Sequence, residues 1–314
     1  MNSKYRFSII IPAYNEEENI GQLIDEVSNV MQRIDSSYEM IVIDDGSNDG
    51  TLKAIITMRE NKPHLKIIQF RKNFGQTAAI DAGIKYSSGE IIITIDSDLQ
   101  NDPEDIPELL NEMNKGFDVV SGWRKNRKDG FVKNIISRVA NILRKLIFKD
   151  KINDSGCTLK VYRRECFNNL ILYGEMHRFI PELLVQKGFK VSEVVVNHRE
   201  RKFGKSKYNF SRTINGFLDM LLLKFWIKFS TRPIHLLGGM GIVLELLGVL
   251  LGIYLTIIKL YYNEPIANRP LLILTILLII SGLLLIVFGL LADIIVKIYY
   301  KDVESYSIKE KFFN

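Results

Sequence analysis

The sequence predicts an α/β domain followed by two membrane-spanning helices. Three observations support this prediction. Short β-branched runs alternate with helical patterns over residues 5–122, polar side chains follow the ends of four of these runs, and two stretches of 25 and 26 residues near the carboxyl end carry almost no charge. Such alternation is typical of a mainly parallel sheet with helices on both faces.

Five runs within the first 122 residues are the predicted strands. They read RFSIIIP, YEMIVID, LKIIQF, EIIITID and FDVVSG. The helices between them are expected to begin near Glu16, Asn48, Gly75 and Pro103, the last with Asp102 as its N-cap. In open sheets of this type ligands gather at the carboxyl ends of the strands. We therefore expect the functional residues in segments 12–16, 44–45, 71–74 and 96–100.

The fourth predicted strand ends on two carboxylates in alternate positions. Asp96 and Asp98 follow EIIITI, and in an extended chain both side chains point to one side. Like charges so placed repel unless a cation lies between them, which fits Mg²⁺ or Mn²⁺ held together with substrate phosphates. The alternative is an ordinary solvated turn, and the pattern by itself leaves both interpretations open.

Composition and missing motifs argue against several classes of protein. Neither G-x-G-x-x-G nor G-x-x-x-x-G-K-[ST] is present, which disfavours a dehydrogenase or an ordinary kinase. Cys157 and Cys166 suggest no disulfide scaffold, and four scattered histidines suggest no zinc site. The formal charge of +6 suits a protein that lies against anionic lipid headgroups, and the sequence contains no nucleic-acid recognition motif.

Residues 234–258 and 271–296 are each long enough to cross a hydrocarbon core of about 30 Å as a helix. Buried helices of a soluble core are the alternative, but such helices rarely stay apolar on every face. Lysines and arginines are more numerous in the flanks than in the connecting loop KLYYNEPIANRP. The positive-inside rule therefore predicts that both flanks lie on the cytoplasmic side of the inner membrane.

The first span carries two features of closely packed helices. Gly248 and Gly252 form G-x-x-x-G, whose partner is either the second span or another subunit, so a homo-oligomer stays open. Glu245 lies near the middle of the span, where a charge facing lipid is costly, so we expect it to face protein. Residues 210–233 mix large apolar and basic side chains and are predicted to form interfacial helices on the inner leaflet.

Taken together, IIIPAYNEEENI, VIDDGSNDGT, FRKNFGQTAAIDAG and TIDSDLQNDPE resemble the nucleotide-sugar domain of inverting family 2 glycosyltransferases with the GT-A fold. The resemblance continues through DSGCTLKVYRRE, MHRFIPEL and RERKFGKSKY into two C-terminal spans, an order that resembles the polyprenyl-phosphate glycosyltransferases. It covers nearly the whole chain. The implied domains are a cytoplasmic GT-A catalytic domain (1–209), amphipathic juxtamembrane helices (210–233), two transmembrane helices with a short external loop (234–300) and a cytoplasmic tail (301–314).

The resemblance implies a nucleotide-sugar donor site at the strand ends. Asp96 and Asp98, with Ser97 between them, would be the DxD motif that holds Mg²⁺ or Mn²⁺ on the diphosphate of UDP or GDP, and Gln100 would face the sugar. A cation there stabilises the negative charge that develops on the leaving diphosphate. The residues implied to line or contact the base and ribose are Pro12, Tyr14, Glu16, Asp44 and Asp45.

The implied acceptor is an anionic polyprenyl phosphate. The family motif R-x-x-G-x-S-K-Y matches Arg201, Ser206 and Lys207, although a basic stripe that only touches lipid headgroups is the alternative. Asp154 takes the place of the family's presumed catalytic carboxylate; because a phosphate monoester is already largely ionised at neutral pH, Asp154 is either a base or an orienting group. His177 either contacts the acceptor or has a structural role, and both interpretations stay open. Further candidates for gripping the acceptor phosphate are Arg124, Arg127, Lys133 and Ser137.

The functional prediction is the inverting transfer of one sugar from a UDP-glucose-like or GDP-mannose-like donor to a polyprenyl phosphate at the cytoplasmic face. A processive polysaccharide synthase is the enzymatic alternative, but the Q-x-x-R-W motif typical of that class is absent. A non-catalytic membrane protein that keeps the nucleotide pocket as a binding module is the other alternative. The intact carboxylates Asp96, Asp98 and Asp154 argue against it.

Overall fold

The computed structural model describes residues 5–34, 37–125, 152–168, 170–172, 174–200, 232–263, 265–266 and 270–299. The described residues belong to two compact units, one within residues 1–221 and the other within residues 222–314.

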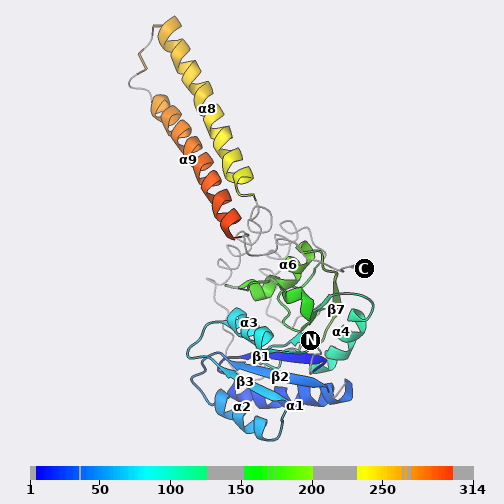
Figure 1. Ribbon diagram of the computed structural model, residues 1–314. Coiled ribbons are helices and arrows are strands. Elements are labelled where there is room, and N and C mark those ends of the chain that lie inside the picture. The colour runs from blue at the N-terminus through cyan, green and yellow to red at the C-terminus, as the bar shows by residue number, and fades with distance from the viewer. Residues whose placement is uncertain are drawn as a thin grey trace. The chain divides into compact units, whose positions relative to one another are not determined.

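A seven-stranded sheet organises the described part of the first unit (Figure 1), with the strand order β3-β2-β1-β4-β6-β5-β7. The first four strands along the chain are parallel, as the alternation of strands and helices predicted. β6 runs antiparallel to β4 and β5, and β7 runs parallel to β5. The strands are β1 (Phe7–Ala13), β2 (Tyr38–Asp44), β3 (Leu65–Gln69), β4 (Ile91–Thr94), β5 (Val119–Trp123), β6 (Lys160–Arg163) and β7 (Val191–Val195).

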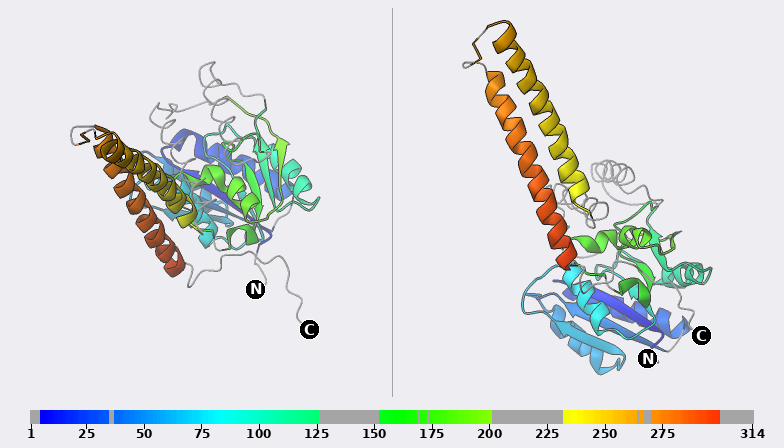
Figure 2. Two further views of the ribbon diagram at one scale, coloured as in Figure 1. Left: turned by 90° about the horizontal axis from the view of Figure 1, so that it is seen from above. Right: turned by 45° about the horizontal axis from the view of Figure 1, so that its top comes forward.

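Helices cover both faces of this sheet (Figures 1 and 2). Alternate side chains of a strand point to opposite faces, so Ile9 and Ile11 of β1 pack with helices α1, α2 and α4, and Ile10 packs with α3 and α6. Burial on both faces explains why β1 and β2 read as continuous apolar runs. The helices are α1 (Glu17–Ile34), α2 (Thr51–Glu60), α3 (Gln76–Tyr86), α4 (Ile106–Met113) and α6 (Ile180–Gln186), with short 3₁₀ turns η1 (Pro103–Asp105), η2 (Arg164–Phe167) and η3 (Met176–Phe179).

The five strands expected from the sequence are confirmed as β1 to β5, and the expected helices begin within a few residues of the predicted positions. Asp102 is confirmed as an N-cap, because its side chain accepts a hydrogen bond from the Glu104 N–H at 3.0 Å. Strands β6 and β7 were not predicted. β6 has four residues and is bounded by Lys160 and Arg163, so it lacks the apolar alternation that marks a strand.

The second unit contains α8 (Ile234–Tyr261) and α9 (Pro270–Tyr299), which run side by side (Figures 1 and 2). Both helices are long and apolar enough to cross a membrane, as the sequence predicted. Glycines bring their backbones together: a Cβ atom added to Gly241 would lie 2.6 Å from the carbonyl oxygen of Gly282. Such close approach is typical of helix contacts in lipid.

The structure also answers two questions about the first span. A Cβ atom on Gly248 would lie 2.6 Å from Cγ1 of Ile279, so the glycine motif packs against the second span. A Cβ atom on Gly282 would lie 2.7 Å from Cγ of Glu245, which places that acidic residue against α9. The expectation that Glu245 faces protein is therefore confirmed.

Candidate active site

The loops that follow β1 and β2 are joined by reciprocal hydrogen bonds. The Asn15 N–H donates to the Ser47 hydroxyl at 3.0 Å, and the Asn15 side-chain oxygen accepts from the Asn48 N–H at 2.8 Å. Asn15 has a φ of 54°, a conformation that costs energy for a residue other than glycine. The cross-loop hydrogen bonds hold it there, so the two loops form one rim.

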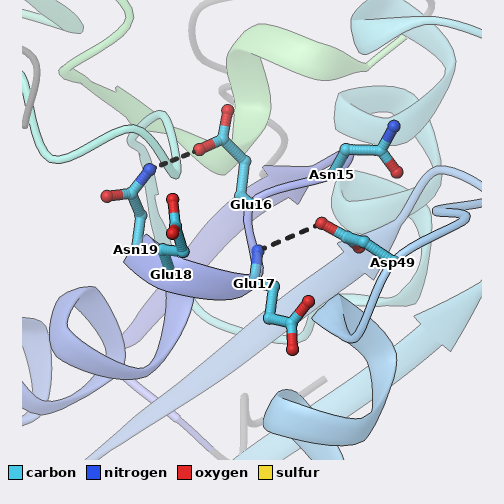
Figure 3. Close-up of a pocket in the computed structure, with 6 residues that line it drawn as sticks. All are labelled: Asn15, Glu16, Glu17, Glu18, Asn19 and Asp49. Carbon is cyan, nitrogen blue, oxygen red and sulfur yellow. Dashed lines mark hydrogen bonds between the residues drawn. The ribbon is translucent and has the colours of Figure 1, made fainter. Parts of the chain in front are cut away.

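A pocket on this rim is lined by acids and amides (Figure 3). The Glu16 carboxylate accepts a hydrogen bond from the Asn19 amide at 2.6 Å. Glu17 accepts from the Gly50 N–H at 2.9 Å, and Asp49 accepts from the Thr51 N–H at 3.0 Å, so both acids stabilise the start of α2. Several of these acids therefore have a structural explanation. The lining residues are Asn15, Glu16, Glu17, Glu18, Asn19 and Asp49.

Asp45, at the end of β2, anchors the start of α3. It is buried, and its two carboxylate oxygens accept hydrogen bonds from the N–H groups of Phe74 at 2.7 Å and Gly75 at 2.9 Å. Its neighbour Asp44 is also buried and accepts from the Ser47 N–H at 3.1 Å. The sequence did not indicate that Asp45 ties the end of β2 to a helix thirty residues further along the chain.

Asp96 and Asp98 lie in a turn. β4 ends at Thr94, and Leu99 adopts a φ of 61°. The Asp98 carboxylate accepts from the Gln100 N–H at 3.2 Å, which closes the turn. The strand therefore ends before the two acids, and the turn at Ser97 and Asp98 means that strand alternation does not decide how they point.

The carboxylate of Asp96 is held from two directions. The Gln76 side-chain amide donates to it at 2.5 Å, and hydrogen bonding by the Thr158 side chain lowers its pKa. Burial, reinforced by the negative charge of Asp98, raises the pKa of Asp96 to about 7. The negative charge on this carboxylate is therefore poorly compensated within the site.

This acid pair suits a hard divalent cation. Oxygen ligands are the ones that Mg²⁺ and Mn²⁺ prefer, and a cation would compensate the charge that raises the pKa of Asp96. In the described part of the chain, no three or more His, Cys, Asp or Glu side chains come together to hold a metal. Substrate phosphates and water would therefore complete the coordination, as is usual for Mg²⁺.

A buried ion pair follows β5. Arg124 donates to Asp154 from Nε at 2.8 Å and from Nη2 at 3.0 Å, so both carboxylate oxygens are engaged. Glu193 of β7 fixes the same loop by accepting from the Asn153 N–H at 2.7 Å and the Asp154 N–H at 2.9 Å. Burial alone would lower the pKa of Arg124, but Asp154 outweighs it and raises that pKa. The guanidinium is therefore permanently charged.

Lys160 is a second buried cation in this region. Its side-chain nitrogen donates to the carbonyl oxygen of Ser155 at 3.0 Å. Burial lowers the pKa of Lys160, and nearby groups such as Glu182 offset the effect only in part. The positive charges of Lys160 and Arg124 both act to lower the pKa of Asp96. The site thus combines an acid pair at the end of β4 with two cations on β6 and just after β5.

The turn after β4 also contacts the chain that follows β7. The Gln100 carbonyl accepts from the Arg199 N–H at 2.9 Å, and Asn101 pairs with His198 in an isolated β-bridge. The guanidinium of Arg199 forms an ion pair with Asp102 at 2.6 Å. The described chain therefore reaches the start of the basic segment RERKFGKSKY beside the acid pair.

Most of the sequence-predicted donor residues lie on these strand-end loops. Pro12 is buried within β1, Tyr14 is half-buried just after it, and Ser97 is buried between the two acids. His177 is buried with its Nδ1 2.7 Å from the Thr77 hydroxyl, a contact within the protein. The predicted residues that lie outside the described ranges are Arg127, Lys133, Ser137, Arg201, Ser206 and Lys207.

Sequence reasoning missed three residues of the site. Gln76 and Thr158 hold Asp96, and Lys160 supplies a buried positive charge near it. All three fall within FRKNFGQTAAIDAG or DSGCTLKVYRRE. Membership of a motif was the available signal, but which atom each side chain contacts depends on strands that are distant in sequence.

Comparison with known proteins gives consistent matches. The Glycosyl transferase family 2 model matches residues 8–171. A dodecaprenyl-phosphate galacturonate synthase of Rhizobium johnstonii is 39% identical over 312 residues, covering 97% of this chain and 92% of that protein. An undecaprenyl-phosphate 4-deoxy-4-formamido-L-arabinose transferase of Salmonella choleraesuis is 34% identical over 296 residues, covering 94% of this chain and 89% of that protein.

Solved structures support the fold. A glucosyl-3-phosphoglycerate synthase of Mycobacterium tuberculosis, in complex with Mn²⁺, UDP and glucosyl-3-phosphoglycerate, matches with a TM-score of 0.56 at 20% identity. The match covers 70% of this chain and 80% of that one. At this identity the likeness is one of fold, and it agrees with a GT-A-like sheet flanked by helices.

Proposed function

Because this chain belongs to glycosyltransferase family 2, we propose that it transfers one sugar from a nucleotide-sugar to a polyprenyl phosphate, forming a polyprenyl-phospho-sugar. The two relatives named above are matched over almost their whole lengths, and each of their names joins a sugar to a polyprenyl phosphate. A processive polysaccharide synthase is disfavoured because both relatives are named for a sugar joined to a polyprenyl phosphate and not for a polysaccharide. The identity of the sugar is not part of this proposal, because the two relatives are named for different sugars.

One observation carries the proposal: an acid pair and two buried cations lie within electrostatic range at neighbouring strand ends. Asp96 lies just after β4, and its pKa is affected by Asp98, Arg124 and Lys160 together. A nucleotide-sugar needs a site that accepts a metal-bound diphosphate, and a lipid phosphate needs positive charge nearby. The acid pair supports the first requirement and the two buried cations support the second.

On the donor side, Asp96 and Asp98 would hold Mg²⁺ or Mn²⁺ against the diphosphate of UDP or GDP. The cation supplies the positive charge that stabilises the departing nucleoside diphosphate. By the family resemblance Gln100 would face the sugar, and its N–H donates to the Asp98 carboxylate at 3.2 Å, which places its backbone beside the acid pair. The rim formed by the loops after β1 and β2, with Tyr14, Glu16 and Asp45, would position the nucleoside.

On the acceptor side, an oxygen of the lipid phosphate would attack C1 of the sugar from the face opposite the diphosphate. A bond from C1 to the acceptor oxygen forms as the bond from C1 to the donor phosphate breaks, so the anomeric centre is inverted. Arg201, Ser206 and Lys207 would grip the acceptor phosphate. They follow Arg199 in the sequence, and the Arg199 N–H donates to the Gln100 carbonyl at 2.9 Å.

Asp154 would act as an orienting group. Its two oxygens accept hydrogen bonds from Arg124, which leaves it poorly placed to accept a proton. A phosphate monoester is already largely ionised at neutral pH, so the reaction does not require a base. Asp154 would then aim Arg124 toward the incoming phosphate, with the cytoplasmic face of the membrane supplying the lipid.

A labelling experiment tests the proposal. Membranes containing the chain are incubated with labelled UDP-glucose, UDP-galacturonate, UDP-4-deoxy-4-formamido-L-arabinose or GDP-mannose, and lipid is then extracted with organic solvent. We expect one sugar to enter a polyprenyl-phosphate lipid. Replacing Asp98 with Asn should reduce that transfer by about 100-fold or more, because the cation that would stabilise the leaving diphosphate loses a carboxylate ligand.

The matched control is Asp81→Asn on α3, which removes an exposed ion pair with Lys85 away from the strand ends. It should keep wild-type transfer. The proposal fails if no sugar of the panel enters lipid. Its metal component fails if Asp98→Asn is folded, present in the membrane and as active as wild type with metal added.

A further inference from the structure

The carboxylate of Asp96 has two donors that come from distant parts of the chain. Gln76, the first residue of α3, donates from its side-chain amide at 2.5 Å. Thr158, just before β6, has a hydroxyl whose hydrogen-bonding effect lowers the pKa of Asp96. Neither side chain carries charge, so neither neutralises Asp96. Their effect is to fix the direction in which the carboxylate points.

Gln76 is itself held in a rigid turn. The two residues before it, Phe74 and Gly75, donate their N–H groups to Asp45 at the end of β2. The residue after it, Thr77, is buried and lies 2.7 Å from Nδ1 of His177 in η3. Four consecutive residues, 74–77, are therefore bonded to three different parts of the fold. These contacts hold the backbone at Gln76 in place, so its side chain starts from a fixed position.

Thr158 is oriented in a similar way. The side-chain amide of Asn101 donates to the Thr158 hydroxyl oxygen at 2.9 Å, which fixes the position of that oxygen. The Thr158 carbonyl oxygen accepts from the Thr94 hydroxyl at 2.7 Å, which attaches this segment to β4. Asn101 is buried, so solvent does not compete for its amide.

We infer that Gln76 and Thr158 are positioning residues that hold the carboxylate of Asp96 in the orientation required to bind the donor's divalent cation. This inference rests on the proposed function. Metal-binding carboxylates are commonly hydrogen-bonded by outer residues, and losing such a partner typically weakens metal affinity or activity by about 10- to 100-fold. The two donors approach from α3 and from the segment before β6, so together they restrict rotation of the carboxylate.

Direct measurement of Mn²⁺ binding tests the inference without relying on turnover. The full chain in detergent is titrated with Mn²⁺ in the presence of UDP, and free Mn²⁺ is measured by electron paramagnetic resonance. Gln76→Leu and Thr158→Val, which keep size and remove the donor, should raise the Mn²⁺ dissociation constant by about 10- to 100-fold. Thr158→Ser, which keeps the hydroxyl, should bind nearly as tightly as wild type.

Two matched controls use the same residue types elsewhere. Gln22 donates to Glu26 at 2.7 Å on an exposed part of α1, and Thr57 donates to the Lys53 carbonyl at 3.0 Å on α2. Gln22→Leu and Thr57→Val should leave Mn²⁺ binding unchanged. Gln76→Asn, which keeps the amide but shortens its reach, serves as a second variant should Gln76→Leu fold poorly.

Activity gives an independent readout. The sugar-transfer rate of Gln76→Leu should recover as Mn²⁺ is raised, because a misoriented ligand is compensated by mass action whereas a damaged fold is not. The inference is overturned if wild type binds Mn²⁺ with UDP and the folded Gln76 and Thr158→Val variants bind it equally well. If wild type itself binds no Mn²⁺, the metal component of the proposed function fails together with this inference.

Discussion

Arg124 and Asp154 meet as a bidentate pair, with nitrogen to oxygen distances of 2.8 and 3.0 Å. The two residues are thirty positions apart, and their side chains are 14% and 8% exposed. A planar guanidinium that engages both oxygens of a carboxylate fixes the orientation of each group. The pair therefore couples the end of β5 to the loop that Glu193 holds from β7.

Removing either partner of this pair should destabilise the protein. Asp154→Asn or Arg124→Met should each cost about 3–5 kcal/mol, because one buried charge is left without its partner. The double variant Arg124→Met/Asp154→Leu should recover most of that stability, since two apolar groups need no pairing, and yet remain inactive in sugar transfer. Urea unfolding in detergent, followed by tryptophan fluorescence, measures the first effect. Single variants as stable as wild type would contradict the expected buried pair.

Glu39 should make stability depend on pH. Burial would raise its pKa, but hydrogen bonds from Lys66, Ser8 and Ser88 outweigh burial and leave the pKa below its usual value of 4.5. A lowered folded-state pKa stabilises the protein above pH 4.5, and this contribution is lost as the pH falls through the folded-state value. At pH 7, Glu39→Gln should lower the free energy of unfolding by about 1.5–3 kcal/mol.

The difference in the free energy of unfolding between wild type and Glu39→Gln should then become smaller as the pH falls below about 4.5. Thermal melting at a series of pH values measures it. Glu60, which is exposed at the end of α2, provides the matched control, because Glu60→Gln should show no such narrowing. If the difference in stability between wild type and Glu39→Gln stays constant from pH 7 to pH 3, the ionised Glu39 carboxylate does not cause it.

Gly46 should tolerate no side chain. Its φ is +70°, and an added Cβ atom would lie 2.4 Å from the backbone carbonyl carbon of Lys72. Gly46→Ala should therefore combine backbone strain with a clash and lower the free energy of unfolding by more than about 2 kcal/mol. Gly116→Ala separates the two effects, because Gly116 also has positive φ but has open space around it. If both variants lose the same free energy of unfolding, backbone strain alone explains the effect and the clash with Lys72 does not contribute.

Gly282 should be needed for the pairing of α8 and α9. A Cβ atom there would lie 2.7 Å from the carbonyl oxygen of Gly241, so Gly282→Ala should push the helices apart at a cost of about 1–3 kcal/mol. Amide hydrogen exchange of peptides from both helices, in detergent, should become faster. Gly239→Ala is the control, since nothing lies within 4 Å of a Cβ atom at that position. Unchanged exchange in Gly282→Ala would contradict the close contact.

Lys207→Ala should raise the substrate concentration needed for half-maximal transfer while leaving folding intact. A lysine that contacts a phosphate contributes charge to binding, and its loss should be visible for either the donor or the lipid. Lys85→Ala removes an exposed lysine that pairs with Asp81 and should leave both values unchanged. Kinetics of Lys207→Ala identical to wild type for both substrates would show that the phosphate site lies elsewhere.

Local pattern was sufficient for much of the fold. The β-branched runs that became β1 to β5, and the two uncharged stretches that became α8 and α9, each carry their signal within a short window. The insertion of β6 between β4 and β5 carried no such signal, because a four-residue strand bounded by Lys160 and Arg163 resembles a loop. Its position depends on pairing with two strands that are far away in sequence.

The sequence by itself determined which residue types follow β4, including Asp96 and Asp98, and placed Asp154 in the segment before β6. Tertiary structure alone decided their partners: Gln76 and Thr158 for Asp96, and Arg124 for Asp154. The physical reason is that a residue's type and neighbours are local properties of the chain. A hydrogen bond between residues twenty or more positions apart exists only once strand order and helix packing have brought their atoms within about 3 Å.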